Sequence, residues 1–399
     1  MNTLSLKRAA AGAALLGILF PGADASAAPA KQPAEKGGYT LQSVLAVGGA
    51  DAADESFFYE KFGTVRVDAD GAGNVYVLDN GNARVQVFDP EGNPLRTIGS
   101  EGEGPGEFQI PARLAVNEKG RVAVFDMGQA RVSVFDETGA LLWDRVAGEV
   151  RDLAMTAAGD VLLGFGKHGP AQVQAFDASG KLLWEGGELE PPGGMVIDIQ
   201  LGGQTVAPRL AIVDGQKLFR TPEGEYRVQA FSLSGKALDP YVRAFTRQAV
   251  TAEDMMPPSR GDDDEEGGPR MVMIKRESPG GDTEDVDVRG GGGASFTTDD
   301  GETMELSMDR MKKFMPKHHP DTRGVLAWPD GRIWVITAED QGDAMVTDEW
   351  SADGRWLRQF TVPADYAFLN VGRDGQLYAV THDEDDYPTV HRLAVKRGA

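Results

Sequence analysis

Residues 65–92 read VRVDADGAGNVYVLDNGNARVQVFDPEG, and the pattern of this stretch recurs along the chain. It consists of a short apolar strand, a glycine turn, a second apolar strand, a polar gap, a third strand ending in an aromatic residue, and a second glycine turn. Further copies occupy residues 114–139 and 153–180, a weaker one occupies 210–235, and a fifth and a sixth occupy 325–354 and 369–393. The closing aromatic residues Phe88, Phe135, Phe176 and Phe231 are 47, 41 and 55 residues apart.

A repeat of this length with about four short strands per unit is typical of a β-propeller. Each four-stranded sheet has two apolar faces, because successive side chains of a strand such as 84–88 (RVQVF) point to opposite sides. Radial stacking of the sheets buries both faces and leaves only short edges. We therefore predict an all-β, six-bladed β-propeller of four-stranded blades over residues 39–399.

The sixth copy ends the chain without a clear fourth strand. Residues 39–47 (YTLQSVLAV) form an apolar segment that belongs to no copy. We predict that this N-terminal strand completes the last blade and closes the ring. The alternative is a capping strand outside the ring.

The gap between the fourth and fifth copies is too long for one repeat, and its excess lies at about 246–321. Residues 251–303 hold 15 Asp or Glu but only 5 Lys or Arg. We predict a partly helical, partly disordered insertion between blades 4 and 5. Residues 251–254 could cap a short helix, and the apolar spacing over 304–315 favours an amphipathic helix. A hidden seventh blade is the alternative.

The N-terminus has the order of a secretory signal peptide. Lys7 and Arg8 precede an apolar run over 9–20, and Ala25-Ser26-Ala27 gives a cleavage pattern. The run is too short for a membrane span. We predict a signal peptide over 1–27, a flexible leader over 28–38, and a periplasmic or secreted mature protein without an integral membrane segment.

Charge and composition exclude several classes of partner. The net charge of −22 and the pI of about 4.6 argue against a nucleic-acid partner, because a polyanion requires a basic surface. The chain has no cysteine, which excludes disulfides, thiolate nucleophiles and cysteine-ligated zinc. No P-loop, nucleophile elbow or H-E-x-x-H motif is present, so no cofactor is predicted.

The junction of the first two copies resembles the NHL repeat. It contains 84–89 (RVQVFD), then 102–108 (GEGPGEF), then Pro111, and this specific match extends over residues 84–135. The whole mature chain is similar to exported bacterial six-bladed propellers of the NHL and TolB-like superfamily. The resemblance implies a fold and an extracytoplasmic compartment, and it implies little about chemistry.

Three sets of residues are candidates for a metal site. His319 and His382, with Asp383 beside the latter, could converge on calcium or zinc because their segments flank neighbouring blades. The stretch 68–71 (DADG) resembles the start of a calcium loop, but it lacks the later acidic positions and aligns with the repeat's turns. The acidic run 262–266 could bind calcium or a basic partner, and a solvated loop is the simpler interpretation.

Two classes of function remain open. The first is a binding module for a protein, peptide or glycan ligand outside the cytoplasm, since a propeller offers a rigid face lined by loops. The alternative is a metal-dependent enzyme of the lactonase or lyase type with its site over the central channel. A periplasmic accessory subunit of an envelope complex is a third possibility.

Overall fold

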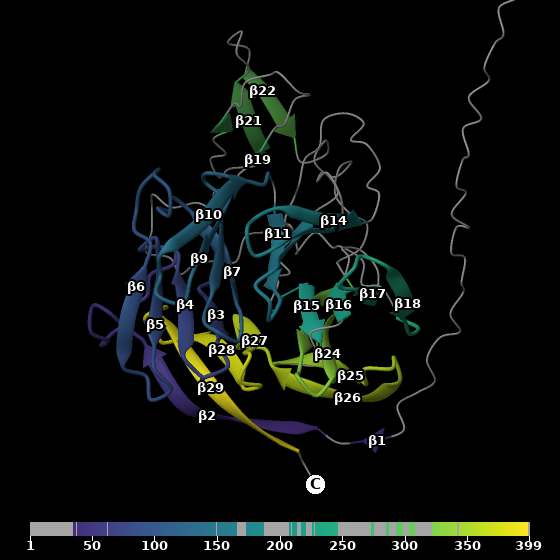
Figure 1. Cartoon of the computed structure of the whole chain (residues 1–399). Coiled ribbons are helices and arrows are strands. Elements are labelled where there is room, and N and C mark those ends of the chain that lie inside the picture. Colours follow the sequence, from purple (N-terminus) through teal and green to yellow (C-terminus); the bar gives the residue numbers. More distant parts are fainter. Residues whose placement is uncertain are drawn as a thin grey trace, which may run out of the picture.

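The computed structural model of the chain describes residues 35–36, 38–61, 63–148, 150–165, 173–186, 207–208, 210–213, 217–220, 226, 228–245, 273–274, 285–286, 293–297, 303–307, 321–340 and 343–397. Within these residues the secondary structure consists of strands, which form six blades (Figure 1). The predicted signal peptide lies outside the described residues, as does most of the predicted leader.

The first three blades are antiparallel sheets of four consecutive strands. Blade 1 contains β3 (Arg66–Ala69), β4 (Val75–Asp79), β5 (Arg84–Phe88) and β6 (Pro94–Ile98). Blade 2 contains β7 (Pro111–Val116), β8 (Val122–Asp126), β9 (Arg131–Phe135) and β10 (Leu141–Val146). Blade 3 contains β11 (Val150–Met155), β12 (Val161–Phe165), β13 (Val173–Phe176) and β14 (Leu182–Gly186).

The last three blades follow the same plan with two additions. Blade 4 contains β15 (Leu210–Val213), β16 (Lys217–Arg220), β17 (Val228–Ser232) and β18 (Ala237–Tyr241). Blade 5 contains β23 (Thr322–Ala327), β24 (Ile333–Asp340), β25 (Ala344–Trp350) and β26 (Trp356–Pro363), and β1 (Glu35–Lys36) pairs in parallel with β26. Blade 6 contains β27 (Phe368–Val371), β28 (Leu377–His382), β29 (Pro388–Arg397) and β2 (Tyr39–Gly48).

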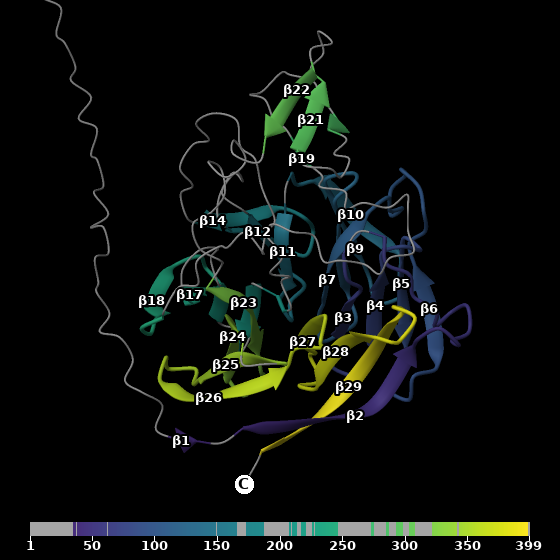
Figure 2. The same ribbon diagram turned by 180° about the vertical axis from the view of Figure 1, so that it is seen from behind.

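The ring closes through the N-terminal strand, as the sequence predicted. Strand β2 pairs antiparallel with β29 from Tyr39 opposite Arg397 to Gly48 opposite Thr389. The two strands run together along the lower side of the molecule (Figure 2). The innermost strands also form a closed circuit, because each contacts the innermost strand of the next blade and β27 contacts β3. The chain therefore joins its two ends within a single sheet.

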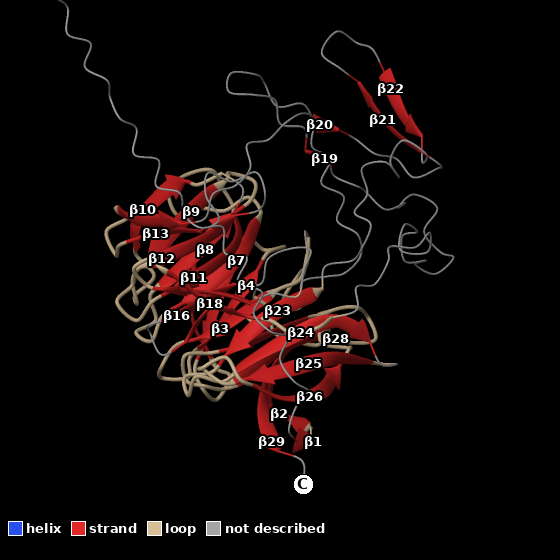
Figure 3. Ribbon diagram, turned by 90° about the vertical axis from the view of Figure 1, so that its right-hand side faces the viewer, coloured by secondary structure: helices blue, strands red, loops and turns tan. Residues whose placement is uncertain are grey.

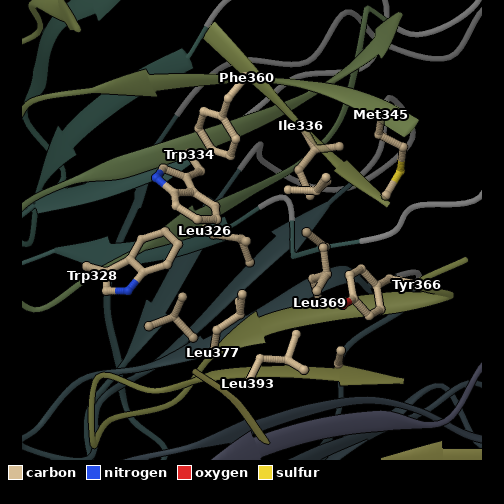
Figure 4. Close-up of a cluster of buried hydrophobic side chains, with 14 residues drawn as sticks. Leu326, Trp328, Trp334, Ile336, Met345, Phe360, Tyr366, Leu369, Leu377 and Leu393 are labelled. Carbon is tan, nitrogen blue, oxygen red and sulfur yellow. The ribbon is translucent and has the colours of Figure 1, made fainter. Parts of the chain in front are cut away.

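The blades stack as the two-faced pattern of the repeat requires. In β4, Val75 and Val77 pack toward blade 6, whereas Tyr76 and Leu78 pack toward blade 2. Each of the six interfaces between described blades has its own cluster of buried apolar side chains. Figure 4 shows the cluster between blades 5 and 6, where Trp328 and Trp334 face Leu369 and Leu377.

One turn shows why the repeat needs glycine. Gly120 has a φ of 85°, which L side chains rarely adopt. A Cβ at this position would also lie 2.5 Å from the hydroxyl of Tyr76 in blade 1. The glycine therefore permits both the turn and the close approach of neighbouring blades.

The insertion between blades 4 and 5 differs from its prediction. Its described residues form two two-stranded sheets, which stand clear of the blades in Figure 3 and contain no seventh blade. These strands are β19 (Met273–Ile274), β20 (Asp285–Val286), β21 (Gly293–Thr297) and β22 (Thr303–Ser307). The predicted helix over 304–315 is wrong at its start, because β22 pairs with β21 and its polar–apolar alternation suits a strand. The remainder of that helix, the helix cap at 251–254 and the acidic run 262–266 lie outside the described residues.

Candidate functional site

A small cavity of about 30 Å³ is lined mainly by residues of the innermost strands β3, β7, β11 and β27. Strand β3 contacts both β7 and β27 (Figure 1). Residues of blades 1, 2, 3 and 6 line it, together with Ala207 and Pro208, which precede β15 of blade 4. The lining is Arg66, Val67, Arg113, Leu114, Arg151, Asp152, Leu153, Ala207, Pro208, Phe368 and Asn370. A cavity contacted by so many blades is held rigidly by the closed ring.

Three consecutive blades each contribute an arginine to this cavity. Arg66 begins β3, Arg113 lies near the start of β7, and Arg151 lies near the start of β11. The β7 and β11 ladders each have an irregularity at these positions, and such bulges redirect side chains at the ends of strands. Asp152 is the acidic residue of the lining, so the described wall of the cavity is cationic although the whole chain is strongly acidic.

The positive charge of Arg66 is only partly compensated by its surroundings. Its guanidinium lies 4.4 Å from the centre of the Phe368 ring, and its buried Nη1 has no hydrogen-bond partner among the described residues. Burial, followed by the positive charge of Arg113, lowers the pKa of Arg66 to about 9. Asp152 and Glu60 act in the opposite direction and do not restore it.

Arg113 is fixed by the backbone around it. Its Nε donates a hydrogen bond to the carbonyl of Arg151 at 2.7 Å, and its Nη1 donates to the carbonyl of Ala112 at 2.8 Å. Asp152 Oδ1 accepts a hydrogen bond from the amide of Leu153. Because these bonds hold the side chains in place, the cavity needs little reorganisation to receive a ligand.

The opposite end of the inner strands is crossed by another arginine. Arg373 follows β27, and its Nε and Nη2 donate to the carbonyls of Val116 and Met155, the last residues of β7 and β11. Its amide donates to the carbonyl of Ala69, the last residue of β3. Arg373 therefore ties blades 1, 2 and 3 to its own blade 6 at this end. We expect access to the cavity from the other end, where the inner strands begin.

Asp68 belongs to the end that Arg373 crosses. Its carboxylate is buried and accepts hydrogen bonds from the amides of Val116 and Ala69. Burial raises the pKa of Asp68 to about 6, and the charge of Arg373 and the two hydrogen bonds oppose that rise. The bond to Val116 joins blade 1 to blade 2, which gives Asp68 a structural role.

The predicted calcium-loop candidate is a turn. Asp70 Oδ1 accepts hydrogen bonds from the amides of Ala72 and Asn74, and its Oδ2 accepts one from the Asn74 side chain. The same arrangement recurs at Asp89 in the next turn of blade 1. Both carboxylates are thus used to close turns of the repeat, in agreement with the interpretation that the alignment of the copies favoured.

The predicted metal candidates at the end of β28 contact other groups. His382 Nε2 lies 3.0 Å from Glu60 Oε2, and Asp383 accepts hydrogen bonds from the amides of Ala50, Asp385 and Tyr387. Those hydrogen bonds lower the pKa of Asp383. His319 lies outside the described residues, so its convergence with His382 stays a prediction. Among the described residues no three His, Asp or Glu side chains gather as metal ligands.

The sequence analysis missed the cavity arginines, although the sequence contains a signal for them. Arg66, Arg113, Arg151 and Arg323 each lie seven or eight residues before the positive-φ glycine of their own turn, namely Gly73, Gly120, Gly159 and Gly331. Arg66 and Arg113 occupy the same register position, three residues before the last residue of their strands. Arg151 and Arg323 lie one position earlier, at irregularities of the β11 and β23 ladders. Arg66, Arg113 and Arg151 bring positive charge to the cavity.

Comparisons with known proteins agree on the fold. A family model described as a 6-bladed beta-propeller matches residues 55–144. A solved Bacteroides fragilis structure, named as an exported protein, is similar at a TM-score of 0.53 and 12% identity, covering 92% of this chain and 98% of that one. The fold class is therefore a six-bladed β-propeller.

Other solved propellers are less similar. A streptogramin B lyase has a TM-score of 0.44 and 12% identity over 90% of this chain and 98% of its own. A gluconolactonase from Xanthomonas campestris has a TM-score of 0.41 and 12% identity over 83% and 87%. These likenesses carry no argument about chemistry. The search of curated proteins found no match.

Within the part of the chain that the structure describes, we find no helix with the length and apolar character needed to cross a membrane.

Proposed function

We propose that the chain is an exported, NHL-like propeller that acts as a binding module for a protein, peptide or glycan ligand in the periplasm or outside the cell. One observation carries the proposal: a cavity at the centre of a closed ring, lined from several blades and held by hydrogen bonds to the backbone. Ligand sites favour such concave, preformed positions.

The cavity's charge distinguishes this function from the metal-dependent alternative. Arg66, Arg113 and Arg151 would repel a divalent cation placed among them. The described lining has one carboxylate, Asp152, whereas calcium takes six to eight oxygen ligands. The cavity therefore favours binding over metal-assisted lactone or lyase chemistry.

Ligand binding at the channel can be tested with two matched tryptophan variants. Leu114→Trp would obstruct the cavity, whereas Leu183→Trp adds the same bulk on the outer strand β14, where Leu183 is 50% exposed. Purified wild-type protein is screened against peptide and glycan arrays. We expect Leu114→Trp to lose the bound ligands and Leu183→Trp to retain them. Equal binding by both variants would contradict a site in the channel.

Export is tested separately by fractionation of cells that express the full chain. We expect the protein in the periplasmic or secreted fraction, shortened at its N-terminus. A full-length protein confined to the cytoplasm would contradict this part of the proposal.

A further inference from the structure

The innermost strands place three arginines around one small cavity, and this cluster has properties that a purely structural group would not need. Structural arginines in a core are paired with carboxylates, because an uncompensated buried charge is costly. For Arg66, the opposing negative charges in the described structure are those of Asp152 and Glu60, and neither carboxylate accepts a hydrogen bond from its Nη1. Glu60 is also engaged by the amide of Val65 and by His382.

We propose that this cavity is an oxyanion site, which receives the carboxylate, sulfate or phosphate group at the end of a ligand, with Arg66 as the principal donor. Arg66 Nη1 is buried and has no hydrogen-bond partner in the described structure, so an oxyanion would supply the missing acceptor. The inference rests on the proposed binding function and names the ligand chemistry of its site.

The size and rigidity of the cavity agree with this chemistry. A space of about 30 Å³ is large enough for one small charged group. Phe368 supports the face of the Arg66 guanidinium, which leaves the fork of N–H donors at its edge for an acceptor. Arg113 is already fixed by two carbonyls, so it adds positive charge without having to move.

A second arginine provides a matched control. Arg145 on the outer strand β10 lies 4.3 Å from the centre of the Phe176 ring, nearly the same arrangement as Arg66 on Phe368. Unlike Arg66, Arg145 donates a hydrogen bond to the carbonyl of Gly180. A general effect of removing an arginine from an aromatic ring would appear in both variants, whereas loss of the oxyanion site would appear only at Arg66.

The test measures oxyanion binding by the full protein directly. Sodium sulfate, phosphate and acetate are titrated at constant ionic strength, adjusted with chloride, and binding is followed by calorimetry and by the melting temperature. We expect saturable binding by wild type and Arg145→Met, and at least a tenfold weaker affinity in Arg66→Met and Arg66→Lys. Circular dichroism verifies that each variant is folded.

Two results would overturn the proposal: no saturable binding of any oxyanion by wild type, or equal affinity in wild type and Arg66→Met. A second experiment distinguishes a free anion from an anionic group on a larger ligand. It compares the binding of oligosaccharides and peptides that carry a free carboxylate with the binding of their amidated forms. If the arrays identify neutral ligands whose binding is unchanged in Arg66→Met, the oxyanion proposal is wrong and the proposed binding function stands. If the protein binds free oxyanions but no ligand on the arrays, the proposed function as a binding module is wrong and the cavity is a site for free anions.

Discussion

Two part-buried arginines, Arg66 in the channel and Arg243 between blades 4 and 5, differ in what surrounds them. Arg243 donates from Nε to the fully buried Asp348 at 2.5 Å and lies 4.6 Å from the centre of the Tyr226 ring. Burial opposes its charge, but Asp348 and Tyr226 outweigh burial, so the pKa of Arg243 is raised. The pKa of Arg66 is lowered to about 9. The positive charge of Arg243 is thus balanced by its neighbours, whereas the positive charge of Arg66 is balanced only partly.

A structural arginine has its counter-charge within the protein, whereas an arginine that binds a ligand needs a counter-charge from outside. Asp348 also accepts hydrogen bonds from the hydroxyl of Tyr226 and the side chain of Gln359. Arg243 Nη2 has no hydrogen-bond partner in the described structure but lies 4.0 Å from Glu339 Oε2, so this cluster supplies its own negative charge. In the channel, Arg66 Nη1 is buried without a hydrogen-bond partner among the described residues. In a marginally stable protein an unsatisfied buried donor is costly, and function is a common reason that such a cost persists.

The largest expected effect is at Arg243. Replacing it by methionine would leave Asp348 buried without its cation, at an expected cost of about 3–5 kcal/mol in the free energy of unfolding. Denaturant unfolding measures the change. Arg131→Met is the control, because Arg131 pairs with Asp144 at a more exposed site and should cost below about 1 kcal/mol. Equal losses in the two variants would contradict the distinction.

The second effect concerns Asp68, whose carboxylate is at the end of the channel that Arg373 crosses. Its pKa is raised from 3.8 to about 6, so the folded state holds this proton more tightly than the unfolded state. The stabilisation from protonation is present below pH 4 and is lost as the pH rises through about 6. Wild type should therefore lose roughly 2 kcal/mol relative to Asp68→Asn between pH 4 and pH 7.

This difference is measured by parallel denaturant titrations at each pH, and the Asn variant cancels the titration of all other groups. A constant difference between the two proteins across this range would show that Asp68 has an ordinary pKa. Burial at this end of the channel would then not raise the pKa of Asp68.

Replacing Arg66 should change the stability of the fold in the opposite direction from replacing Arg243. In the absence of ligand, Arg66→Met removes a poorly compensated charge and keeps the apolar contact with Phe368, so we expect stability to be unchanged or to rise by about 1 kcal/mol. Thermal unfolding of wild type and variant in low salt measures this. A loss above about 2 kcal/mol would make Arg66 a structural residue like Arg243.

The smallest effect is the pH dependence of oxyanion affinity. The affinity of wild type for sulfate should be level between pH 6 and 8 and should fall above pH 9, because Arg66 then loses its proton. A bound anion would raise the pKa of Arg66, so binding at pH 9 should take up protons. Calorimetry in two buffers of different ionisation enthalpy measures that uptake. A profile shared by wild type and Arg66→Met would contradict the role of Arg66.

The sequence predicted the architecture because the blades are specified locally. Alternating strands and turn glycines define each blade, and the unassigned strand over 39–47 predicted the closure with β29. The site was not predicted, because its arginines come from blades about 40 residues apart and their direction depends on bulges in β7 and β11. Of the chemically conspicuous residues, His382 instead contacts Glu60 and Asp383 closes a turn.

The most direct test of the oxyanion site is a crystal structure grown with selenate, whose selenium gives an anomalous signal. The account predicts one strong anomalous peak within hydrogen-bond distance of Arg66 Nη1, in the cavity bounded by Arg113 and Arg151. A cavity that stays without anomalous density while selenate binds elsewhere on the protein would contradict it.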